Sequence, residues 1–99
     1  MPTAKITVKY FGMLHDIVGK RSEILSVEES DTAMDLVREM SRRNGKRFRD
    51  FVFDSHGELR SGLAFAINGA SVERSELSKI KSKGISEFVI LPPISGGAK

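Results

Sequence analysis

The stretch FVILPPISGGAK, residues 88–99, decides how the chain is organised. Its apolar first half predicts a buried closing strand. Two consecutive prolines, Pro92 and Pro93, end that strand because neither has an N–H to donate to a neighbouring strand. The residues after them are small or polar and can bury little surface. We therefore predict a folded domain over residues 1–93 and a flexible C-terminal tail with a di-glycine over residues 94–99.

Upstream of this stretch, the pattern of apolar residues predicts three further strands and a short hairpin return. Residues 4–11 and 22–28 alternate apolar with polar side chains, and a helical turn over residues 13–18 joins them, most simply as an antiparallel pair. Residues 63–67 form the next strand. It ends in Asn68-Gly69, a dipeptide that favours a type I′ turn into residues 71–73. Leu77 and Ile80 predict a short helical turn before the last strand.

One substantial helix is expected in the middle of the chain. Three candidate N-caps, at residues 30–32, precede apolar residues spaced i, i+3, i+4 and i+7 from Ala33 to Met40. Asn44-Gly45 is expected to end this helix. Residues 48–53 mix aromatic with charged side chains, so an irregular segment or a short strand over the helix end is expected there.

Composition excludes several classes of protein. The 99 residues contain no cysteine, which excludes disulfides, thiolate metal sites and cysteine nucleophiles. No apolar run is long enough to span a membrane, so a cytoplasmic protein is expected. His15 and His56 have no accompanying ligand cluster, and no catalytic motif is present, so neither a metal site nor catalytic residues are expected.

The order of elements permits one arrangement in particular. If the last strand lies parallel beside the first, the chain forms a ubiquitin-like β-grasp roll of the α+β class. Its mixed sheet has four or five strands, with one main helix and short helical turns. The resemblance described next supports the same fold.

Three segments together carry a resemblance to a known family: the ending FVILPPISGG, the opening ITVKYFG and the middle FDSHGELRSGLAFAINGASV. They resemble the ubiquitin-like sulfur carriers, which include the small subunit of molybdopterin synthase and the small archaeal modifier proteins. The most specific part is the strand followed by Pro-Pro-x-Ser-Gly-Gly.

The resemblance implies that a ubiquitin-activating-type adenylyltransferase uses ATP and Mg²⁺ to adenylate the carboxylate of Gly97. The product is then converted to a thiocarboxylate that donates sulfur in molybdopterin biosynthesis, or is joined to a lysine of a target protein as an isopeptide. The chain itself would be neither an enzyme nor a cofactor-binding protein. Gly96 and Gly97 would matter because a side chain at either position would hold the chain away from the activating site.

The resemblance also implies a docking surface for the activating enzyme or for the large subunit of molybdopterin synthase. Phe88 and Ile90 are expected to point inward. We expect an apolar docking patch of outward-facing residues near the end of the last strand: Phe11, Val89, Leu91, Pro92 and Pro93.

Two features depart from the family pattern. Ala98 and Lys99 follow the second glycine, so either a protease cleaves between Gly97 and Ala98 or the carrier function is absent. Residues 83–87, which are usually acidic in the family, include a lysine at their start, so the electrostatics of partner binding are expected to differ.

One alternative function comes from the basic residues. The formal charge is +3, and five cations cluster around the end of the predicted helix. They would suit a β-grasp module that binds RNA or an acidic protein, although few aromatic residues are free to stack on bases. The cluster comprises Arg42, Arg43, Lys46, Arg47 and Arg49.

Overall fold

The structure is a computed structural model and describes residues 2–93. Its elements are β1 (Thr3–Tyr10), α1 (Gly12–Val18), β2 (Ser22–Glu28), α2 (Ala33–Val52), β3 (Ala64–Ile67), β4 (Ala70–Val72), the 3₁₀ turn η1 (Arg74–Glu76) and β5 (Glu87–Leu91). Within residues 2–93, no helix combines the length and the apolar character needed to cross a membrane.

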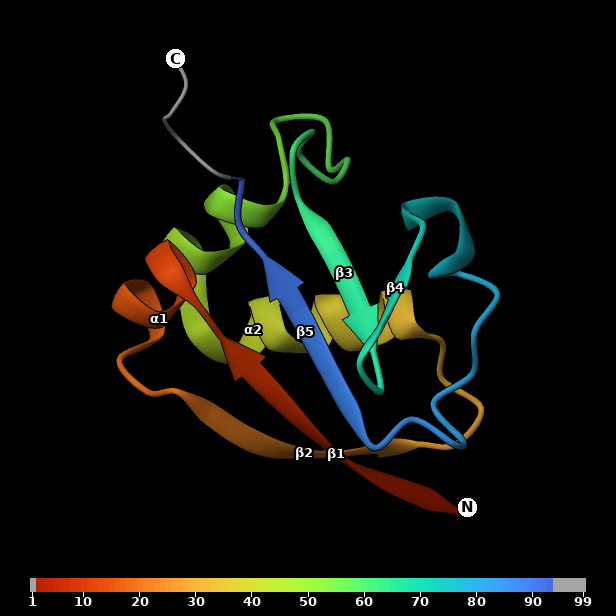
Figure 1. Cartoon of the computed structure of the whole chain (residues 1–99). Coiled ribbons are helices and arrows are strands. Elements are labelled where there is room, and N and C mark those ends of the chain that lie inside the picture. The colour runs from red at the N-terminus through yellow and green to blue at the C-terminus, as the bar shows by residue number, and fades with distance from the viewer. Residues whose placement is uncertain (1, 94–99) are drawn as a thin grey trace.

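The strands form one mixed sheet in the order β2-β1-β5-β3-β4 (Figure 1). β1 pairs antiparallel with β2 and parallel with β5, while β3 pairs antiparallel with both β5 and β4. The α2 helix lies across one face of this sheet (Figure 1). The predicted α+β, β-grasp architecture is therefore confirmed, and β5 lies in the centre of the sheet between the first and third strands.

The core lies between the sheet and α2. On β1 the alternate residues Ile6, Val8 and Tyr10 are at most 2% exposed, and on β5 Phe88 and Ile90 are fully buried. The alternation follows from the strand period of two, which sends successive side chains to opposite faces. The inward direction predicted for Phe88 and Ile90 is confirmed.

The α2 helix begins as predicted and ends later than predicted. Thr32 is its N-cap: the Thr32 hydroxyl accepts from the N–H of Asp35, and the Asp35 carboxylate accepts from the N–H of Thr32. Hydrogen bonds from the Thr32 backbone hold the pKa of Asp35 below its usual range. The expected break at Asn44-Gly45 is confirmed, because Gly45 has non-helical φ and ψ, but a second helical segment follows this kink and continues to Val52.

Burial explains why the helix continues. Phe48 and Val52 are one helical turn apart and both fully buried, so both contribute to the core. Gly45 has φ +87° and ψ −173°, which breaks the helical path for one residue only. The irregular segment or short strand predicted over residues 48–53 is therefore corrected to the last turns of α2.

The β3–β4 hairpin agrees with its predicted turn. Asn68 and Gly69 both have positive φ, at 52° and 85°, as a type I′ turn requires, and Ile67 pairs with Ala70 across it. The return strand is β4 at residues 70–72, one residue earlier than predicted. The predicted short helical turn is confirmed: it begins with η1, and hydrogen bonds from the N–H groups of Lys79 and Ile80 to the carbonyl of Glu76 continue it past the buried Leu77.

Candidate functional site

The candidate site is the place where β5 leaves the sheet. The last residue pairs of β5 are Tyr10 with Ile90 on one side and Ala64 with Leu91 on the other. After Leu91 the chain continues into Pro92, which is half-buried, and Pro93, which is exposed. The chain therefore leaves from the middle of the sheet, between two neighbouring strands (Figure 1).

Two large apolar side chains lie exposed beside this point. Leu91 is 39% exposed and Phe11, the residue after β1, is 46% exposed. Their neighbours Tyr10 and Ile90 are directly paired, so Phe11 and Leu91 follow adjacent positions of two parallel strands. The structure thus brings together the two residues for which the resemblance implies partner docking.

Val89 differs from its expected exposure. It lies on the face of the sheet opposite the core, as alternation predicts, but it is only 8% exposed. Its paired neighbours are Lys9 and Ala66, and the Lys9 ammonium forms an ion pair of 2.7 Å with Glu87 on the same face. The flanking strands and the Lys9 stem therefore cover Val89, and the exposed patch is smaller than predicted.

The expected activation residues lie further along the chain. Gly96 and Gly97, together with the possible cleavage point between Gly97 and Ala98, lie outside the described residues. Their role stays a prediction.

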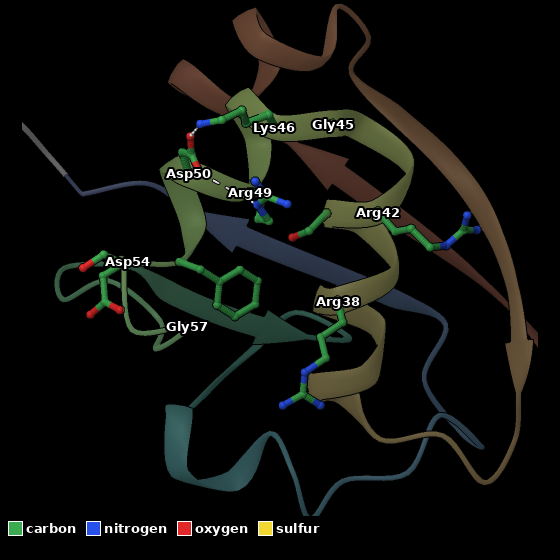
Figure 2. Close-up of a pocket in the computed structure, with 11 residues that line it drawn as sticks. Arg38, Arg42, Gly45, Lys46, Arg49, Asp50, Asp54 and Gly57 are labelled. Carbon is green, nitrogen blue, oxygen red and sulfur yellow. Dashed lines mark hydrogen bonds and ion pairs between the residues drawn. The ribbon is translucent and has the colours of Figure 1, made fainter.

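The basic cluster lies on the second half of α2, where Arg42, Lys46 and Arg49 line an open pocket together with residues 53–55 and Gly57 (Figure 2). Acidic neighbours offset several of these cations. Arg42 contacts Glu39 at 2.6 Å and Lys46 binds Asp50, and these bonds lower the pKa values of Glu39 and Asp50. The ion pairs lower the local positive potential that a polyanion would meet.

The aromatic residues near this cluster also argue against a nucleic-acid site. Phe48 is fully buried, and Phe51 packs partly against the core. Base stacking requires an exposed aromatic face, which Phe48 does not offer. The aromatic residues that nucleic-acid binding would require, Phe48 and Phe51, therefore pack in or against the core.

The residues that the structure describes do not form a candidate metal site. No group of three or more His, Asp or Glu side chains there could hold an ion. His15 lies 3.8 Å from the neighbouring Asp16, and His56 sits in the turn after α2, where the Asp54 carboxylate accepts its backbone N–H.

A polar contact near the site was not evident from the sequence. The Tyr10 hydroxyl donates to the Glu23 carboxylate and accepts from the Asn44 amide at 3.1 Å, which ties β1 to β2 and α2. Burial and the bond to Glu23 raise the pKa of Tyr10. Burial alone would raise the pKa of Glu23, but hydrogen bonds from Tyr10 and Lys20 hold it below its usual range. No local motif links residues so far apart in the sequence.

Comparison with known proteins gives the same picture from independent data. The ThiS family model matches residues 8–97. The molybdopterin synthase sulfur carrier subunit of Homo sapiens is 29% identical over 97 residues, which cover 98% of this chain and 99% of that protein.

Solved structures share the fold. Small archaeal modifier protein 1 from Haloferax volcanii superposes with a TM-score of 0.81 at 24% identity, over 95% of this chain and 100% of that one. The protein of the same name from Methanosarcina acetivorans gives 0.77 at 23% identity, over 98% and 100%. Because the match to the ThiS model extends over most of the sequence, including β5 and the residues up to 97, this chain belongs to the ThiS family.

Proposed function

We propose that this protein is a ubiquitin-like carrier whose Gly97 carboxylate is activated and transferred by other enzymes. The observation that carries the proposal is the way β5 ends. A central strand leads through two prolines to a di-glycine, beside the exposed Phe11 and Leu91. The family match, which extends to residue 97, supports the same endpoint.

The proposed chemistry needs no catalytic group on this chain. The Gly97 carboxylate attacks the α-phosphorus of Mg²⁺-bound ATP in the partner enzyme and displaces pyrophosphate. The resulting acyl-adenylate has AMP as leaving group. A sulfide-level nucleophile then displaces AMP to give a thiocarboxylate, or a lysine amine displaces it to give an isopeptide. The carrier is the substrate in each step.

Chain length restricts where the partner can bind. Four residues, 94–97, separate Pro93 from the end of the di-glycine, and they can span at most about 14 Å. The activating site must therefore come within that distance of the end of β5. An enzyme so close to the domain will contact the surface around Phe11 and Leu91, which makes this surface the proposed docking patch.

The proposed partners follow from these steps. They are a ubiquitin-activating-type adenylyltransferase and then either the large subunit of molybdopterin synthase or lysines of target proteins. Since Ala98 follows Gly97, the bond between them must be cleaved before activation, which requires a processing protease. We propose a cytoplasmic location, where ATP is available to the activating enzyme.

Mass spectrometry of the protein recovered from its own cells tests the proposal. We expect loss of the residues after Gly97, together with replacement of one oxygen by sulfur at the terminus or a Gly-Gly remnant on partner lysines. Sulfur at the terminus selects sulfur donation, and the remnant selects protein modification. An intact C-terminus with neither change, in cells that synthesise molybdopterin, would contradict the carrier function.

A reconstituted reaction gives a second test. The described elements end at Leu91, so a chain that stops at Gly97 keeps every one of them. This shortened chain, with the activating enzyme of the same organism, ATP and Mg²⁺, should release pyrophosphate and form an acyl-adenylate. The full chain should not react until it is cleaved. Equal reaction of both chains would contradict a requirement for a free Gly97 carboxylate.

A further inference from the structure

Each of the two prolines after β5 lies against a glycine from a neighbouring segment. A methyl group built on the Cα of Gly12 would stand 3.1 Å from Cγ of Pro92. One built on Gly62 would stand 3.0 Å from Cβ of Pro93. Both distances are shorter than the usual carbon–carbon contact of about 3.5–4.0 Å. A side chain at either glycine would therefore push against a proline ring.

This closeness is confined to these two glycines. Five other glycines among the described residues also have positive φ, and a methyl group on any of them would meet no atom within 4 Å. Their conformation explains why they are glycines. At Gly12 and Gly62 the conformation gives only part of the reason, and the close approach of a proline ring gives the rest. The five are Gly19, Gly45, Gly57, Gly69 and Gly84.

The sheet register explains how the contacts arise. The parallel pair Tyr10 with Ile90, continued by two residues, places Gly12 level with Pro92. The antiparallel pair Ala64 with Leu91, continued by two residues, places Gly62 level with Pro93. Because β1 and β3 flank β5 (Figure 1), the two glycines lie on opposite sides of the departing chain, one after β1 and one before β3.

The proline rings suit this position. A proline cannot donate to a neighbouring strand, and its ring fixes φ near −65°. The rings occupy the space that a side chain on either glycine would need. Contact on both sides and a fixed φ together restrict the direction of the backbone at residues 92 and 93.

We propose that Gly12 and Gly62 are positioning residues for the activation of Gly97. With Pro92 and Pro93 they form a glycine–proline collar that sets the direction in which the tail leaves the domain. This inference rests on the proposed function. The collar sets where the chain of at most about 14 Å that reaches the activating site begins and which region it can reach, and a displacement of about 1 Å at a reacting group can cost roughly a hundredfold in rate.

The experiment compares Gly62→Ala and Gly12→Ala with two matched controls. Gly84 has φ +91°, close to the +90° of Gly62, but it lies near the start of β5, away from the two prolines, and has open space around it. Gly19, at the other end of α1 from Gly12, is also open. Gly84→Ala and Gly19→Ala therefore introduce backbone strain without contact to a proline.

Adenylation kinetics are measured on chains that end at Gly97, with the activating enzyme of the same organism, ATP and Mg²⁺. We expect kcat to fall at least tenfold in the two collar variants while KM for the carrier changes less than twofold, because the exposed side chains of Phe11 and Leu91 are unchanged. The controls should keep the wild-type kcat. Equal kcat in collar variants and controls would overturn the collar.

A structural measurement on the full chain accompanies the kinetics. Nuclear Overhauser contacts between the Hα atoms of Gly12 and ring protons of Pro92, and between Gly62 and Pro93, should appear in the wild type and in both controls, and weaken in the collar variants. Their absence from the wild type would overturn the collar whatever the kinetics show.

Two further comparisons separate the possible failures. If Gly62→Ala does not fold, Pro93→Ala opens the same contact without backbone strain and should lower kcat in the same way. If Pro93→Ala keeps the wild-type kcat, the collar is overturned.

If the wild-type chain ending at Gly97 is not adenylated at all, the proposed function is wrong and the positioning role falls with it. If it is adenylated and only the collar variants behave like controls, the function stands and the collar does not.

Discussion

The start and the end of β5 are held by different kinds of contact. At the start, the side-chain oxygen of Asn68 accepts from the backbone N–H groups of Ser86 and Glu87, at 2.8 and 3.0 Å, and from the Ser86 hydroxyl. The Asn68 amide donates to the carbonyl of Gly84 at 3.0 Å. The Glu87 carboxylate also forms an ion pair with the Lys9 ammonium. Hydrogen bonds and charge therefore fix this end.

At the end of β5, steric contacts take the place of hydrogen bonds. Leu91 still pairs with Ala64, but Pro92 and Pro93 have no N–H to donate, and they lie against two glycines. The side chains presented here, Phe11 and Leu91, are apolar and exposed. A partner can cover this surface without first breaking ion pairs or hydrogen bonds.

The difference indicates how one strand serves two purposes. The polar bonds at its start hold β5 in register, so that the exit point does not shift. The apolar, sterically guided end leaves the chain available to an enzyme. We therefore expect changes at the start of β5 to alter stability and changes at its end to alter transfer.

The largest expected effect is at the far end of the tail. Gly97→Val, in a chain that stops at residue 97, should lower the adenylation rate roughly a hundredfold, because a branched side chain displaces the carboxylate from the attacking position. The thermal unfolding temperature should not change, since the described elements end at Leu91. Pyrophosphate release and calorimetry measure the two quantities. A wild-type rate would remove the di-glycine from the mechanism.

The next effect is at the start of β5. Asn68→Gly preserves the positive φ of 52° but removes the side-chain hydrogen bonds. We expect it to lower the free energy of unfolding by about 1–2 kcal/mol, since exposed bonds are partly replaced by water. Urea unfolding gives the value, and Asn68→Asp, which keeps the acceptor oxygens, should lose less. The adenylation rate should stay within twofold. An adenylation rate that falls by more than twofold, with an unchanged free energy of unfolding, would contradict the proposed division between the two ends.

Several of these features could be predicted from sequence because their causes are local. Alternation predicted which faces of β1 and β5 are buried, and Asn68-Gly69 predicted the turn that places Asn68 beside residues 86 and 87. Residues 30–32 were recognisable as candidate N-caps, and Thr32 is the one that caps the helix. Each of these signals lies within a few residues, where backbone geometry restricts the choices.

The errors and omissions come from contacts between distant parts of the chain. The break at Gly45 was predicted correctly, but the second helical segment that follows it was not, because its formation depends on the burial of Phe48 and Val52 in the core. Val89 faces outward by alternation, yet its central position in the sheet covers it. The pairing of Gly12 with Pro92 depends on the strand order, which local pattern does not specify. The docking residues Phe11 and Leu91 were named through a family resemblance rather than through geometry.

A smaller effect is expected at the docking patch. Leu91→Ser should raise KM for the carrier in adenylation about tenfold, which corresponds to about 1.4 kcal/mol of binding, with kcat and unfolding temperature little changed. Ile24 offers a matched control: it is 65% exposed on the same face of the sheet, on β2 at the edge. Ile24→Ser should leave KM unchanged. If both variants raise KM equally, the patch extends across the whole face and the end of β5 has no special role.

The smallest expected effect concerns Glu23, which binds Tyr10 at the end of β1, beside the exit of β5. Its pKa is lower in the folded chain than in the unfolded chain, so the contact adds stability above the unfolded value of about 4.3, and this stability is lost as the pH falls through the folded pKa. We expect a contribution of about 0.5 kcal/mol, typical of a partly solvated pair.

Urea unfolding between pH 7 and pH 3 should therefore show a smaller acid-dependent loss of unfolding free energy for Glu23→Gln than for the wild type. Tyr10→Phe should shift the remaining loss toward the ordinary glutamate pKa, because the donor that stabilises the carboxylate is gone. Adenylation at pH 7 should be the same in Glu23→Gln as in the wild type, since this contact fixes β1 to β2 and α2 and not the departing chain. An unchanged pH dependence in both variants would show that the polar contact beside the exit does not contribute to stability, and that core packing and the sheet hydrogen bonds hold this end of β1 without it.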